Sequence, residues 1–114
     1  MDLRVLVVED EMVILLLIED MLAELGCTNI VSAKSIVTAL PLIGANVFDV
    51  AILDVNLDGE TSYAIADVLT RNNIPFMFSS GYSDHADPAY HGHILLEKPY
   101  SLERLSEALT MALA

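Results

Sequence analysis

"FDVAILDVNLDG", Phe48 to Gly59, is the most informative stretch of this sequence. An apolar run fills its first half and ends in the acidic residue Asp54. The chain begins with a similar run, "LRVLVVEDE", in which Glu9 and Asp10 follow the apolar residues. Apolar runs of about four to eight residues are typical of buried strands. We therefore expect two buried strands that each carry carboxylates at the C-terminal end.

Similar apolar runs recur along the chain, and segments compatible with helices separate them. Strands that alternate with helices predict βα units around a parallel sheet. The runs are "LRVLVV", "NIVSA", "VAILDV", "PFMFS" and "HILLE". We expect a first helix over about Glu11 to Leu25, ended by a left-handed Gly26, and a second that begins at an N-cap at Ser35 and is shortened or kinked by Pro41. Two further helices are expected over Ser62 to Asn72 and, behind an N-cap at Ser101, over Leu102 to Ala112.

The segment between the fourth and fifth apolar runs is short. Its sequence, "GYSDHADPAYHG", spans Gly81 to Gly92 and contains Pro88. We expect at most a turn or two around Asp87 to Tyr90, so a fourth helix at this place would be short or irregular.

The composition narrows the classes of function. With 114 residues the chain fits one domain, which we expect to span residues 1–114. A formal net charge of -12 argues against direct binding to nucleic acids or to anionic membranes. The longest unbroken apolar run, Met12 to Ile18, is too short to span a bilayer, and the N-terminus does not resemble a signal peptide. Because Cys27 is the single cysteine, we expect a reducing, cytoplasmic location.

The carboxylates at the strand ends predict a metal site. In a doubly wound sheet the C-terminal ends of the strands converge on one edge, where a crevice opens. Carboxylates that meet there raise one another's pKa or require a cation, and Mg²⁺ prefers such oxygen ligands. We expect Mg²⁺ to bind Asp10, Asp54 and the backbone carbonyl of Asn56, with Glu9 slightly further back. The alternative for Asp10 is that it caps the following helix.

Two further strand ends place a hydroxyl and an ammonium group beside the acids. The fourth strand ends in "FSSGY", which contains Ser80, and the fifth ends in "LLEKP", which contains Lys98. Taken singly, Ser80 could form a turn before Gly81 and Lys98 could form an ordinary salt bridge. The coincidence of four strand-end signals favours one functional site.

An acid pair, a lone aspartate, Ser-Gly and Lys-Pro, in this order, resemble the receiver domain of two-component response regulators over essentially the whole chain. The resemblance implies a flavodoxin-like (βα)5 fold, which is a doubly wound parallel five-stranded sheet of order 2-1-3-4-5. The stretch "PFMFSSGYS" is similar to a variant subgroup whose fourth strand ends in Phe-Ala-Thr-Gly and an aromatic residue. Here Ser79 and Ser80 replace the Ala-Thr of that subgroup.

The resemblance also implies a phosphoacceptor. With Mg²⁺, Asp54 would take a phosphoryl group from a histidine kinase or a histidine phosphotransfer protein and form an acyl phosphate. Ser80 and Lys98 would then move toward the phosphoryl group, which is the implied switch. Such a protein is no enzyme beyond slow self-catalysed phosphorylation and dephosphorylation. If the chain is complete, we expect a downstream protein partner to receive the signal by binding. If the chain was cut from a longer regulator, an effector domain would carry the output.

The sequence departs from the family pattern in the region of the switch. Leu95 occupies a position where most receivers carry an aromatic residue, and Tyr82 is a candidate substitute. We regard Leu95 and Pro99 as candidate switch or loop residues. Asp58 stands where many receivers carry a proline, so the loop after Asp54 should differ in shape. A short fourth helix makes dimerisation through that face less expected but leaves dimerisation open.

The first helix is more apolar than one buried stripe requires. The excess in "MVILLLI" could pack against the last helix, or it could form an exposed patch for a kinase helix bundle or for dimerisation.

Two other functions compete with the phosphoacceptor. One is an Mg²⁺-dependent phosphohydrolase with an aspartyl-phosphate intermediate, in which the residue two positions after the nucleophile is commonly an acidic proton donor. Asn56 occupies that position and argues against the enzyme. The other is a receiver-like interaction module that works without phosphorylation, and the complete set of strand-end residues argues against it.

Overall fold

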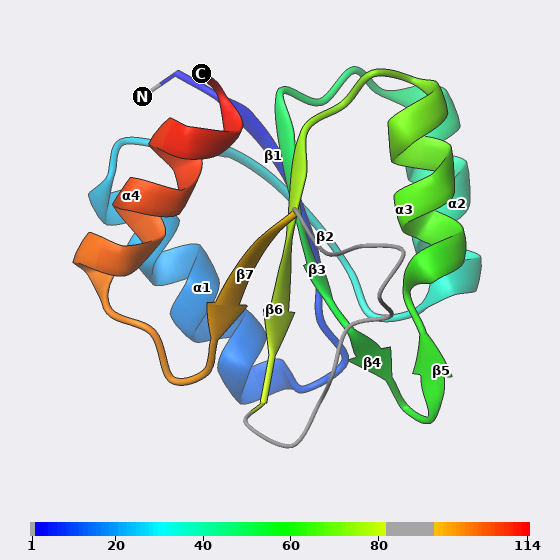
Figure 1. The fold of residues 1–114 in the computed structure, drawn as a ribbon, viewed down its shortest axis with the longest axis horizontal. Helices are drawn as coiled ribbons and strands as arrows, with labels where there is room; N and C mark the ends of the chain where they lie inside the picture. Colours follow the sequence, from blue (N-terminus) through cyan, green and yellow to red (C-terminus); the bar gives the residue numbers. More distant parts are fainter. Residues whose placement is uncertain (1, 82–92) are drawn as a thin grey trace.

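The computed structural model describes residues 2–81 and 93–114 of the chain. Five strands form one parallel sheet, with helices on both of its faces (Figure 1). The strands are β1 (Arg4–Val8), β2 (Asn29–Ala33), β3 (Val50–Asp54), β6 (Phe76–Ser80) and β7 (Ile94–Glu97). Across the sheet they follow the order β2-β1-β3-β6-β7. This order confirms the predicted doubly wound, flavodoxin-like fold.

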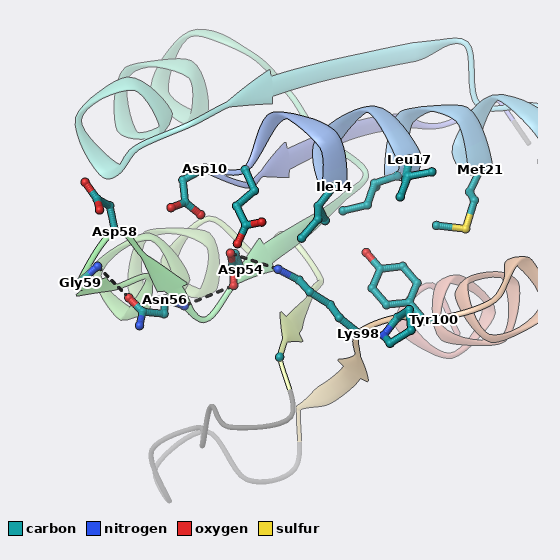
Figure 2. A pocket seen from close by; sticks show the side chains of 14 residues that line it. Asp10, Ile14, Leu17, Met21, Asp54, Asn56, Asp58, Gly59, Lys98 and Tyr100 are labelled. Carbon is teal, nitrogen blue, oxygen red and sulfur yellow. Dashed lines mark hydrogen bonds and ion pairs between the residues drawn. The ribbon is translucent and has the colours of Figure 1, made fainter.

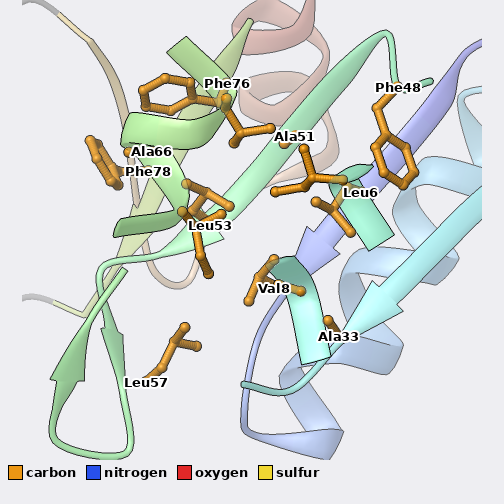
Figure 3. Close-up of a cluster of buried hydrophobic side chains, with 14 of the residues drawn as sticks. Leu6, Val8, Ala33, Phe48, Ala51, Leu53, Leu57, Ala66, Phe76 and Phe78 are labelled. Carbon is orange, nitrogen blue, oxygen red and sulfur yellow. The ribbon is translucent and has the colours of Figure 1, made fainter. Parts of the chain in front are cut away.

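Within residues 2–81 and 93–114, two helices cover each face of the sheet. The helices are α1 (Met12–Glu24), α2 (Ile36–Ala45), α3 (Tyr63–Arg71) and α4 (Leu102–Ala112). α1 and α4 pack on one face, and α2 and α3 pack on the other (Figure 1). The sheet therefore separates two hydrophobic cores, and Figure 3 shows the one that lies under α2 and α3.

The side chains of β3 alternate between the two cores. All of its residues are buried, as the apolar run predicted. Ala51 and Leu53 face α2 and α3, whereas Val50 and Ile52 face α1 and α4. Because side chains alternate along a strand, Asp54 follows Ile52 onto the side of α1 and α4. The apolar run of β3 thus places one buried carboxylate, that of Asp54, at the C-terminal edge of the sheet.

The ends of the helices agree with the capping signals in the sequence. The Ser35 hydroxyl accepts a hydrogen bond from the Thr38 N–H at 3.2 Å, and the Ser101 hydroxyl accepts one from the Arg104 N–H at 3.1 Å. Both serines are the predicted N-caps. Gly26 follows α1 with a φ of 89°, the left-handed conformation that a glycine adopts without strain.

Pro41 does not end α2, which continues through it to Ala45. A proline inside a helix lacks one backbone donor and so removes one hydrogen bond. Packing compensates, because Ala39 and Ile43 on either side of Pro41 are buried in the core.

The loop after β3 contains a small antiparallel ribbon that the sequence analysis did not predict. It consists of β4 (Asn56–Leu57) and β5 (Glu60–Thr61). Asp58 and Gly59 join the two strands with φ values of 52° and 89°. Two positive φ values in a two-residue connection are typical of a type I′ turn, for which Asp-Gly is a favoured sequence.

The first helix both packs and remains exposed. Its buried residues Leu15, Ile18 and Leu22 share a core with α4, as one alternative predicted. Four large apolar residues of α1 are also exposed: Met12 (46%), Val13 (71%), Leu16 (51%) and Leu17 (56%). That they dock a kinase helix bundle or a second copy stays a prediction.

Several predictions fall on residues that the structure does not describe. The turns around Asp87 to Tyr90, the short fourth helix and the candidate switch residue Tyr82 all lie outside residues 2–81 and 93–114. Within those two ranges, none of the helices has the length and apolar character that crossing a lipid bilayer requires.

Candidate functional site

Three carboxylates meet at the C-terminal edge of the sheet. Asp54 is the last residue of β3, and Glu9 and Asp10 directly follow the neighbouring strand β1. One oxygen from each of Glu9, Asp10 and Asp54 lies within 4.8 Å of the others. Asp54 and Glu9 are buried, with 5% and 1% of their surfaces exposed. The parallel register of β1 and β3 thus brings together acids that are 44 to 45 positions apart in the chain.

Lys98 bridges two of these acids. Its Nζ lies 2.6 Å from Glu9 Oε1 and 3.2 Å from Asp54 Oδ2. The second Glu9 oxygen, Oε2, accepts a hydrogen bond from the Glu11 N–H at 3.2 Å. The Lys98 N–H donates to the Ser80 carbonyl at 2.8 Å. Lys98 therefore contacts the end of β6 through its backbone N–H, and it contacts the residues at the ends of β1 and β3 through its ammonium group.

Burial and charge set the ionisation of this group. Burial raises the pKa of Asp54 most, and the hydrogen bond and negative charge of Glu9 raise it further. Lys98 opposes both effects, yet the pKa of Asp54 stands at about 8. Burial lowers the pKa of Lys98, but its contacts with Glu9 and Asp54 raise that pKa on balance. The Lys98 ammonium thus offsets only part of the effect that burial and Glu9 have on Asp54.

The three carboxylates fit a hard divalent cation. Their donor atoms are all oxygens, which Mg²⁺ and Ca²⁺ prefer over nitrogen and sulfur. Because burial and Glu9 raise the pKa of Asp54, an additional positive charge beside Asp54 would favour its ionised form. Asp10 and Asp54 line a cavity, whereas Glu9 is enclosed behind them. Asp10 and Asp54 are therefore the residues that would hold Mg²⁺.

Asn56 lies beside Asp54 in the same cavity. Its backbone N–H donates to Asp54 Oδ1 at 3.4 Å, and its side-chain oxygen accepts from the Gly59 N–H at 3.0 Å (Figure 2). These contacts hold the ribbon turn next to the acids. The role of the Asn56 carbonyl as a metal ligand stays a prediction.

The cavity has an acidic part and an apolar part. Its volume is about 630 Å³, and Figure 2 shows Asp10, Asp54 and Asp58 toward one end and Leu17 and Met21 of α1 toward the other. Lys98 lies between the two parts, at the boundary of carboxylates and hydrocarbon. Asp10 does not cap α1, because the N-cap position is occupied by Glu11.

The other predicted residues take different positions. Ser80 is buried, and its carbonyl contacts Lys98; the role of its hydroxyl stays a prediction. Pro99 lines the cavity, whereas Leu95 packs against the core of α2 and α3. Sequence reasoning missed Tyr100, whose ring lines the cavity two residues after Lys98. The signal for it was an aromatic residue in the loop that follows a functional strand end.

Comparisons with known proteins agree with this geometry. The family model described as the response regulator receiver domain matches residues 5–110. The transcriptional regulatory protein YvrH of Bacillus subtilis (strain 168) is 31% identical over 84 residues, which are 73% of this chain and 35% of YvrH. The match thus spans about a third of that protein.

Two solved structures are similar over nearly their whole length. The solution structure of SdrG from Sphingomonas melonis Fr1 is 35% identical, with a TM-score of 0.91 and coverage of 99% of this chain and 98% of SdrG. The BeF3-activated conformation of SdrG from Pseudomonas melonis Fr1 is 34% identical, with a TM-score of 0.85 and coverage of 97% and 96%.

Proposed function

Because this chain belongs to the response regulator receiver family of two-component systems, we propose that it accepts a phosphoryl group on Asp54. One observation carries the assignment: the buried Asp54 carboxylate lies 3.2 Å from the Lys98 ammonium in a cluster with Asp10 and Glu9. Receiver domains generally serve as phosphoacceptors rather than as enzymes. The cluster supplies a nucleophile, a cation and two acids that can attract a metal ion.

The proposed reaction is a phosphoryl transfer from a phosphohistidine. One carboxylate oxygen of Asp54 forms a bond to phosphorus while the bond from phosphorus to the histidine nitrogen breaks, and the electron pair leaves on the imidazole. Asp54 must be ionised to attack, so its raised pKa opposes the reaction in the absence of a metal ion. Mg²⁺ bound by Asp10 and Asp54 would supply positive charge for the carboxylate and the phosphoryl oxygens.

Lys98 has a role before and after the transfer. Its ammonium neutralises part of the charge of Asp54 and Glu9 in the structure described here. Once Asp54 is an acyl phosphate, the negative charge lies on the phosphoryl oxygens, and Lys98 moves its ion pair toward them. Ser80, whose carbonyl accepts from the Lys98 N–H, would move with it and offer its hydroxyl.

The phosphoryl donor and the receiver of the signal are proteins in this proposal. A histidine kinase or histidine phosphotransfer protein must reach Asp54, and Leu17, one of the exposed apolar residues of α1, lines the same cavity. The negative charge of the chain favours protein partners over direct contact with nucleic acid. The cytoplasmic location and dimerisation stay predictions.

The phosphohydrolase alternative is weaker. An enzyme of this kind commonly needs a proton donor near Asp54, but Asn56 carries an amide whose oxygen is hydrogen-bonded to the Gly59 N–H. The other alternative, an interaction module that works without phosphorylation, predicts that the protein accepts no phosphoryl group.

The first experiment is an intact-mass measurement after incubation with acetyl phosphate, with and without Mg²⁺. We expect a single phosphoryl adduct that requires Mg²⁺ and is absent from Asp54→Asn, which keeps the size of the side chain but removes the nucleophile. If acetyl phosphate and a panel of histidine kinases both fail to label the wild-type protein, the interaction module is the better assignment.

A further inference from the structure

Tyr100 occupies a part of the cavity that the proposed phosphoryl transfer does not use. Its ring lies between Lys98 and the apolar side chains of α1 (Figure 2). Its hydroxyl accepts a hydrogen bond from the Ser79 hydroxyl at 3.5 Å. Tyr100 belongs to the connection between β7 and α4, only two residues after Lys98.

The partner of Tyr100 is the direct neighbour of Asp54 in the sheet. Ser79 on β6 pairs with Asp54 on β3 in the parallel register. Both side chains point to the side of α1 and α4, because Ile52 and Met77, two residues before them, face that core. Only 1% of the surface of Ser79 is exposed, so its hydroxyl depends on a protein partner.

Two hydrogen bonds hold the segment 98–100 to the end of β6. The Lys98 N–H donates to the Ser80 carbonyl at 2.8 Å, and the Ser79 hydroxyl donates to Tyr100 at 3.5 Å. At 3.5 Å the second bond is longer than the usual hydroxyl hydrogen bond of about 2.5–3.0 Å, so it is the weaker tether. The side chain of Lys98, which belongs to this segment, reaches Glu9 and Asp54.

The Tyr100 hydroxyl also lies within the electric field of the acidic cluster. Burial is the main cause that raises its pKa. The hydrogen bond with Ser79 and the charge of Lys98 lower this pKa, whereas the charges of Glu9 and Asp54 raise it. A change of charge at Asp54 therefore changes the electrostatic environment of the Tyr100 hydroxyl.

We propose that Tyr100 is a positioning residue of the phosphoacceptor site: its hydrogen bond with Ser79 holds segment 98–100 in the unphosphorylated arrangement. When Lys98 follows the charge from the Asp54 carboxylate to a phosphoryl group farther out, the weaker tether opens. Tyr100 then moves relative to Leu17 and Met21, which alters the apolar part of the cavity. This inference rests on the proposed function of Asp54.

The test is a titration with BeF3⁻, as a phosphoryl analogue, at saturating Mg²⁺. The proteins are wild type, Tyr100→Phe, Ser79→Ala and the double variant, and NMR gives the bound fraction. Because the tether is long and stabilises only the unbound arrangement, we expect each single variant to bind BeF3⁻ about two- to threefold more tightly, the low end of the net contribution of a hydrogen bond. The double variant should match either single variant, since both remove the same bond.

Tyr63→Phe is the matched control, because it removes another tyrosine hydroxyl on the opposite side of the sheet, where Tyr63 packs against Phe78. It should leave BeF3⁻ affinity unchanged. In the wild-type protein, the ring signal that Tyr100→Phe removes should shift on BeF3⁻ binding.

The outcomes separate this inference from the function on which it rests. If the wild-type protein neither binds BeF3⁻ with Mg²⁺ nor accepts a phosphoryl group, the proposed function fails, and the inference fails with it. If the wild type binds but Tyr100→Phe and Ser79→Ala bind equally or more weakly, only the inference is overturned. Additive effects of the two changes would also overturn it, because they would show that the hydroxyls act separately.

Discussion

Asp54 is buried, yet the proposed phosphoryl transfer needs it in its ionised form. Burial and the neighbouring Glu9 raise its pKa to about 8, so the folded protein without a metal ion binds a proton that an unfolded aspartate releases near pH 4. Folding is then favoured at low pH and opposed as the pH rises between these two values. A bound divalent cation removes this conflict because it stabilises the carboxylate.

This difference predicts a pH dependence of stability. In the presence of EDTA, the free energy of unfolding of the wild-type protein should fall relative to that of Asp54→Asn as the pH rises from about 5 to about 8. The relative loss should exceed about 1.4 kcal/mol, which corresponds to one pKa unit. Urea titrations at several pH values measure it, and the variant corrects for all other titrating groups.

Saturating Mg²⁺ should recover the stability of the wild type at about pH 8 and have little effect on Asp54→Asn, since binding to the folded state stabilises it by mass action. Parallel pH profiles for the two proteins without metal would contradict the raised pKa.

At the scale of elements, α1 has a surface that the fold does not use. Leu16 is 51% exposed, and its neighbour in the chain, Leu17, is 56% exposed and lines the cavity that contains Asp54. Leu15 and Ile18 of the same helix are buried in the core. A single exposed apolar residue is common, but several on adjacent turns of one helix form a patch of the kind that marks interaction sites.

We predict that Leu16→Glu slows phosphotransfer from a histidine kinase that labels the wild type by about tenfold or more, the range expected of an interface anchor. Labelling by acetyl phosphate should not change, because the small donor needs no docking surface. Val47→Glu is the matched control, since Val47 is 79% exposed and precedes β3 at the end of the strand opposite to Asp54. Unchanged phosphotransfer together with an unchanged oligomeric state would exclude a role for this surface.

The ribbon of β4 and β5 depends on one glycine. Gly59 has a φ of 89°, although a Cβ added there would meet no other atom within 4 Å. The cost of an alanine at this position is therefore conformational and not steric. Gly59→Ala should lower the free energy of unfolding by about 1–2 kcal/mol.

Gly44 offers an internal comparison. It lies inside α2, and a Cβ added there would also meet nothing within 4 Å. Gly44→Ala should raise the free energy of unfolding by about 0.5–1 kcal/mol, because alanine is the better helix former. Urea titrations of the two variants should thus shift in opposite directions, and a stabilising Gly59→Ala would contradict the left-handed turn.

For the whole molecule, the positions of strands and helices could be predicted from the sequence because each depends on local patterns. Apolar runs marked the five long strands, and Ser35 and Ser101 marked helix starts. The strand order is a property of the complete chain, and it came from the resemblance to a family. The ribbon was missed although Asp58-Gly59 is a local turn signal, because its strands are only two residues long.

For the candidate site too, some features could be predicted from the sequence and others could not. Its acids and Lys98 could be predicted because residues after parallel strands reach one edge of the sheet. The pairs they form could not, since Lys98 and Glu9 are separated by 89 positions and their contact depends on register and rotamers. The bond of Tyr100 with Ser79 was missed for this reason, as it joins a loop to a strand across 21 positions.

The parallel sheet also keeps both ends of the described chain away from the acidic cluster. β1 starts and α4 ends at the edge of the sheet opposite to the one that carries Asp54 (Figure 1). A fluorophore or a surface anchor attached near either end would therefore leave the site open. The protein can therefore be immobilised by one end in a sensor, with the edge of the sheet that carries Asp54 pointing toward the solution.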